Sequence, residues 1–74
     1  MTAHRDDIIK FTMEFHNNAA EGTRLLDPET QRLYVRKWSS WLRYEPGTRT
    51  PSQCFARNMV GHCFYLYGGV PPAA

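Results

Sequence analysis

The chain has 74 residues, a formal net charge of +2, and 22% charged residues. This length accommodates one domain near the lower limit for independent folding, and the small charge does not indicate a dedicated nucleic-acid module. Two cysteines exclude a scaffold of several disulfides, and the first ten residues show no secretory signal, so we expect a cytoplasmic protein without a membrane segment.

The first predicted element is a helix over about residues 5–21. Ile8, Phe11, Phe15 and Ala19 recur there at helical spacing, with polar residues on the outer side. The pattern is typical of a helix that buries one apolar stripe against a core.

The second predicted helix spans residues 28–44 and has the clearest start. Asp27 can cap the free amides and Pro28 suits the first helical position. Drawn as a helix, the segment has an aromatic face and an opposite arginine face, which consist of Tyr34, Trp38, Trp41 and Leu42 and of Arg32, Arg36 and Arg43. The aromatic face is predicted to build the core, which leaves the arginine face free.

The third predicted helix spans residues 51–67, after the cap-like sequence Thr50-Pro51. Its apolar stripe consists of Phe55, Met59, Cys63 and Leu66. Together these elements predict an all-α protein: a compact three-helix bundle in one domain, residues 1–69, followed by a short extended or disordered tail, residues 70–74. Trp38 and Phe55 are expected to be core residues whose truncation to alanine costs about 3–5 kcal/mol.

Arginine and aromatic side chains are the residue types that anchor protein interfaces. We therefore predict a partner-binding surface on the second helix that consists of Arg32, Arg36, Lys37, Arg43 and Tyr44. A solvated helix face without a partner is the alternative interpretation of the same row.

Residues capable of catalysis or metal binding are present but poorly arranged. Cys54 and Cys63 on one helix would lie roughly 13.5 Å apart at 1.5 Å per residue, too far to share a zinc ion or form a disulfide. His62 is two helical turns from Cys54, beyond direct contact. A metal site or cysteine–histidine pair completed by His4 or His16 from the first helix is the alternative. We expect no enzyme activity, no metal and no cofactor.

The sequence favours a non-enzymatic small protein-binding module that binds a cytoplasmic protein complex. Short single-domain proteins of this kind serve phages and mobile elements as inhibitors, and an anti-CRISPR-type steric blocker of a host complex is the specific hypothesis. The alternative is a small basic nucleic-acid-associated protein or regulator that contacts the phosphate backbone. A homodimer formed through exposed aromatic residues is a third possibility.

Overall fold

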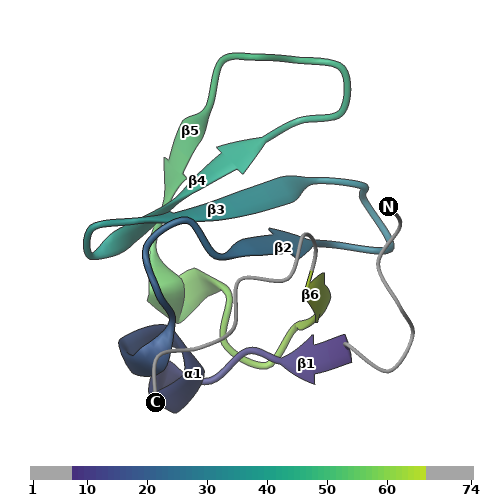
Figure 1. Ribbon diagram of the computed structural model, residues 1–74. Helices are drawn as coiled ribbons and strands as arrows, with labels where there is room; N and C mark the ends of the chain where they lie inside the picture. Colours follow the sequence, from purple (N-terminus) through teal and green to yellow (C-terminus); the bar gives the residue numbers. More distant parts are fainter. Residues whose placement is uncertain (1–7, 67–74) are drawn as a thin grey trace.

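The chain folds into one antiparallel sheet of six strands in the order β1-β6-β2-β3-β4-β5. A computed structural model describes residues 8–66 (Figure 1). The strands are β1 (Ile8–Lys10), β2 (Arg24–Leu26), β3 (Leu33–Lys37), β4 (Ser40–Tyr44), β5 (Ser52–Cys54) and β6 (Cys63–Leu66). Two short helical elements interrupt them, α1 (Met13–Asn18) and the 3₁₀ turn η2 (Ala56–Asn58).

The prediction of an all-α three-helix bundle is therefore wrong. Of the helix expected over residues 5–21, only the six residues of α1 are helical among those described. Residues 28–44 form a turn and the β3–β4 hairpin, and residues 51–66 form β5, η2 and β6. The predicted tail at residues 70–74 lies outside the described part of the chain.

The β3–β4 hairpin shows why the helical pattern misled. Tyr34 pairs with Arg43 and Arg36 pairs with Trp41, so these side chains share the inner face of the sheet. Tyr34 and Trp41 are 6% and 0% exposed and belong to the core, as predicted. Trp38 lies between the two strands and is 78% exposed, so its predicted core position is wrong.

Aromatic rings fill the space enclosed by the curled sheet. Phe11 is fully buried and makes edge-to-face contacts with Phe15, Trp41 and Phe64, at centroid distances of 5.8, 5.5 and 6.1 Å. Phe55, the other residue predicted for the core, is 49% exposed. It immediately follows β5, where the chain turns into η2.

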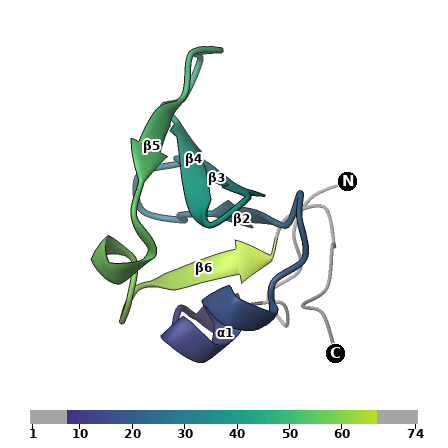
Figure 2. The same ribbon diagram turned by 90° about the vertical axis from the view of Figure 1, so that its left-hand side faces the viewer.

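The short helix α1 covers one side of this core beneath β6 (Figure 2). Thr12 caps it, because its Oγ1 accepts a hydrogen bond of 3.0 Å from the Phe15 amide. His16 is 8% exposed, and its Nδ1 accepts a 3.0 Å hydrogen bond from Nε1 of Trp41. This bond satisfies the buried indole N–H and ties α1 to the sheet.

Candidate functional site

The turn that joins β3 to β4 consists of only two residues, Trp38 and Ser39, because Lys37 pairs with Ser40. Trp38 has a φ of 54° and Ser39 does not have a positive φ. A positive φ is a conformation that glycine adopts far more readily than a residue with a side chain. A tryptophan there carries a steric cost that glycine would not.

A carboxylate outside the hairpin holds this turn in place. The Trp38 amide donates to both oxygens of Glu21, at 3.0 Å to Oε1 and 2.8 Å to Oε2. The neighbouring backbone reinforces the contact, because the Gly22 amide donates to the Arg36 carbonyl and the Arg36 amide donates to the Thr23 carbonyl. The segment after α1 therefore fixes the end of the hairpin.

The indole of Trp38 is presented to solvent by this arrangement. Its 78% exposure is the highest among the large hydrophobic side chains of residues 8–66. The Lys37 Nζ lies 5.7 Å from the ring centroid, within the range of a cation–π contact. We call Lys37, Trp38 and Ser39 the hairpin tip.

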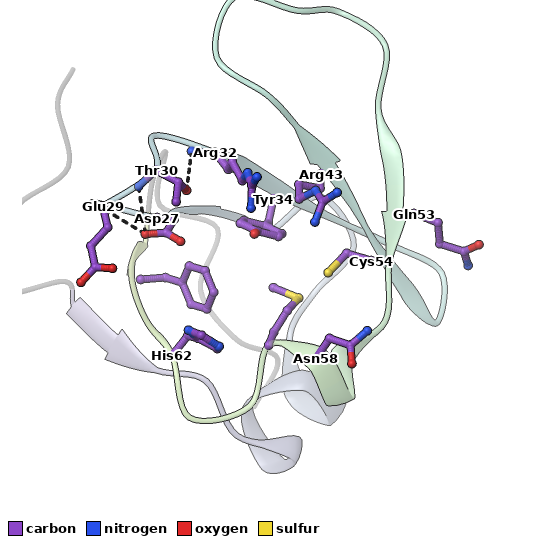
Figure 3. Close-up of a pocket in the computed structure, with 12 residues that line it drawn as sticks. Asp27, Glu29, Thr30, Arg32, Tyr34, Arg43, Gln53, Cys54, Asn58 and His62 are labelled. Atoms are coloured by element: carbon purple, nitrogen blue, oxygen red, sulfur yellow. Dashed lines mark hydrogen bonds between the residues drawn. The ribbon is translucent and has the colours of Figure 1, made fainter.

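A second feature, a polar cavity of about 340 Å³, lies at the other end of the hairpin (Figure 3). Its walls come from the turn after β2, from β3, β4 and β5, and from the chain between β5 and β6 together with β6 itself. The polar lining side chains are Asp27, Glu29, Thr30, Arg32, Tyr34, Arg43, Gln53, Asn58 and His62, and the apolar or sulfur-bearing ones are Cys54, Met59 and Phe64.

Glu45 links the two arginines of this cavity. Arg32 Nε donates a hydrogen bond of 2.9 Å to Glu45 Oε1, and this bond raises the pKa of Arg32. Arg43 Nε lies 3.5 Å from Glu45 Oε2. That ion-pair contact lacks the alignment of a hydrogen bond, so the buried Arg43 Nε has no hydrogen-bond partner among the described residues.

Burial sets the pKa values of two titratable groups near the arginines, Tyr34 and Cys54. Desolvation raises the pKa of the Tyr34 hydroxyl and the pKa of the Cys54 thiol, and the guanidinium groups of Arg43 and Arg32 partly oppose both shifts. Both groups therefore stay protonated near neutral pH, and Cys54 is a poor nucleophile there.

The five residues of the predicted partner-binding surface do not form one surface in this fold. Arg32 and Arg43 line the cavity, whereas Arg36 packs over the Trp41 ring at 5.8 Å from its centroid. Lys37 belongs to the hairpin tip. Tyr44 pairs with Leu33 and points to the outer face of the sheet, away from Arg43.

No local signal in the amino-acid sequence marks the hairpin tip. Two-residue hairpin loops are usually recognised by Asn-Gly, Asp-Gly or Gly-X, and Trp38-Ser39 matches none of these. Glu21, which holds the tip, lies 17 residues earlier in the chain, so its contact depends on tertiary structure.

The helix spacing that was expected to separate Cys54 from Cys63 does not exist, since the two residues lie on β5 and β6. Both thiols are free, Cys54 buried and Cys63 exposed. Over residues 8–66, no group of three or more His, Cys, Asp or Glu side chains is placed to hold a metal ion. In the same part of the chain, no helix is long and apolar enough to span a membrane.

Comparison of the chain with protein-family models, with curated proteins and with solved structures finds no match in any of the three.

Proposed function

We propose that this protein is a non-enzymatic binding module that attaches to a partner protein through its hairpin tip. The observation that carries the proposal is the exposed Trp38 side chain, held at a positive φ by Glu21. Buried tryptophans at the centre of an interface are among the residues that contribute most to binding energy.

The conformation of Trp38 argues for a role outside folding. A non-glycine residue at positive φ costs on the order of 1–2 kcal/mol, and the exposed indole recovers little of this by burial within the domain. Residues held in such conformations by their surroundings occur frequently at binding sites. Two hydrogen bonds from the Trp38 amide to Glu21 supply that external hold.

Affinity capture from bacterial lysate tests the proposal, with the full chain immobilised and bound proteins read by mass spectrometry. Trp38→Gly removes the anchor while suiting the turn, and Val60→Thr is a control that changes another exposed apolar residue, 45% exposed, without altering its shape. We expect a stoichiometric partner on the wild-type and V60T proteins and its loss from W38G. Equal capture by all three would contradict a role for the hairpin tip.

Binding of single-stranded nucleic acid is the second candidate, because bases stack on exposed aromatic rings beside a cation, and Lys37 lies next to Trp38. Nuclease treatment before capture separates the two functions. A protein partner that survives nuclease supports the protein-binding module, whereas nucleic acid bound with steep salt dependence supports the alternative.

The more specific hypothesis, an anti-CRISPR-type steric inhibitor encoded by a phage or mobile element, stays a prediction. The identity of the captured partner tests it, because an inhibitor should reduce that partner's activity at stoichiometric concentration and a constitutive subunit should not. Homodimer formation is likewise a prediction, and light scattering over a wide concentration range tests it.

A further inference from the structure

The polar cavity at the end of the hairpin opposite Trp38 is lined by two arginines, of which Arg32 is hydrogen-bonded to Glu45 and Arg43 is not. Among the described residues, no hydrogen bond engages the Arg43 guanidinium, and its buried Nε has only the 3.5 Å ion-pair contact with Glu45. This Nε atom is enclosed by protein on the side of Glu45, so a ligand in the cavity would be held by the terminal nitrogens of the guanidinium, which donate no hydrogen bond to the described residues.

The position of Glu45 leaves room for a ligand. Glu45 contacts the Nε atoms of Arg32 and Arg43 but does not line the cavity. Figure 3 shows the guanidinium group of Arg32, just before β3, and that of Arg43, on β4, extending toward the hollow above Tyr34 and Cys54. Glu45 therefore orients the arginines from one side while they line the cavity on the other.

The chemistry of the lining indicates the ligand class. Two guanidinium groups side by side match the planar geometry of a carboxylate or phosphate group, which they bind by charge-assisted hydrogen bonds. The amide of Asn58 adds a further polar group at the rim. Asp27 and Glu29 lie on the side formed by the turn after β2 and would repel a second negative group on the same ligand.

The turn that carries these acids is itself fixed. Asp27 Oδ1 accepts hydrogen bonds from the Glu29 amide at 2.9 Å and from the Thr30 amide at 3.4 Å. The Gln31 amide also donates to the Asp27 carbonyl at 2.8 Å. The acidic side of the cavity is therefore set by local backbone geometry and is present before any ligand binds.

We propose that this cavity binds a small ligand with a single oxyanion group, a carboxylate or a phosphate, held by Arg43 and Arg32 and positioned by Glu45. A volume of about 340 Å³ is at the lower end of the range of small-molecule sites. The site is separate from the hairpin tip and does not depend on the function proposed for Trp38.

Titrations followed by ¹H–¹⁵N NMR test the proposal, with sodium acetate, sodium methyl phosphate and sodium chloride as probes at matched ionic strength. We expect saturable shifts at Arg43, Cys54 and Asn58 with acetate, methyl phosphate or both, and none with chloride. Acetate binding alone would identify a carboxylate ligand, and methyl phosphate binding alone a phosphate ligand.

Two variants that each lose one positive charge serve as the test and its matched control. Arg43→Gln should weaken oxyanion binding roughly tenfold or more, as expected for the loss of a hydrogen bond to a charged group. Arg57→Gln removes the same charge from η2, outside the cavity, and should bind as the wild type does. Equal weakening by both variants, or shifts with chloride of the same size, would overturn the proposal.

Asn58→Asp covers the case in which R43Q does not fold. Asn58 is exposed and its side chain makes no hydrogen bond in the described structure, so the substitution preserves the core while placing a negative charge at the cavity rim. Oxyanion affinity should fall in N58D. Wild-type affinity in that variant, or no saturable shift in the wild type, would refute the site.

Discussion

Substituting Trp38 by glycine and by alanine gives two variants whose order of stability follows from one backbone angle. At the φ of 54° observed for Trp38, a Cβ atom costs on the order of 1–2 kcal/mol, which glycine avoids. Glycine loses about 0.5–1 kcal/mol through its greater freedom in the unfolded chain. The W38G variant should therefore be about 1 kcal/mol more stable than W38A, the reverse of the usual order.

The free energy of unfolding of W38G should be close to that of the wild type. Trp38 is 78% exposed, so about a fifth of its side chain contacts the protein, and losing roughly 50 Å² of buried surface costs about 1.3 kcal/mol. The greater freedom of glycine in the unfolded chain adds about 0.5–1 kcal/mol, and relief of the strained angle offsets most of the total in W38G. We expect W38G to unfold within about 1 kcal/mol of the wild type.

Urea denaturation measures these differences directly. Each variant keeps Trp41 as its single tryptophan, and this fully buried residue reports unfolding by fluorescence. Thermal unfolding of the same variants gives a second readout, because a difference of 1 kcal/mol shifts the melting temperature by about 4–8 °C in a domain of this size. If W38A were as stable as W38G or more stable, the positive φ at the hairpin tip and the strain inferred from it would be wrong.

Three further substitutions or conditions test other parts of the structure. Trp41→Ala should cost about 3–5 kcal/mol in urea denaturation, because the variant leaves a cavity in the core and removes the donor to His16; a loss under 1 kcal/mol would refute this packing. Burial, followed by the charge of Arg36, lowers the pKa of His16 below 6.5, so the unfolded state takes up a proton at a higher pH than the folded state. The free energy of unfolding should therefore fall as the pH drops below about 6.5, and it should fall less in His16→Gln. Equal pH dependence of stability in the two proteins would contradict this. Exposed Cys63 should react with Ellman's reagent quickly and buried Cys54 slowly, so Cys63→Ser should lack the fast phase, whereas a fast phase that persists would place Cys54 at the surface.

The capping of backbone amides within a single turn was predictable from the sequence. Asp27 does cap free amides, as predicted, but it caps a turn and not a helix. At Gln31 the φ becomes 64° and the chain reverses into β3. Cap residues specify how a turn begins, and tertiary packing decides whether a helix follows.

The strand pattern of β3 was hidden because both of its faces are partly apolar. Leu33 and Val35 lie on the outer face and Tyr34 on the inner face, while Arg36 on the inner face packs against Trp41. Alternation of apolar and polar residues is therefore absent from the segment. Tyr34 and Trp41 were placed correctly in the core because the two residues share one face in a helix and also share the inner face of the hairpin.

The arginines were predicted as one row, and the hairpin separates them. Arg32, just before β3, and Arg43, on β4, meet at Glu45, a grouping that the pairing of these strands produces. Charge reversal of all the predicted arginines would also disturb Arg36, which has a buried Nη1 atom and packs on the core tryptophan. Single changes at the hairpin tip and in the cavity are therefore cleaner tests than that triple substitution.

The most direct test of the proposed function is the amount of partner protein captured by W38G relative to V60T after nuclease treatment. We predict that V60T retains the wild-type amount and that W38G loses nearly all of it while remaining folded by circular dichroism. Undiminished capture by folded W38G would show that the partner binds elsewhere and that the exposed Trp38 is not the anchor.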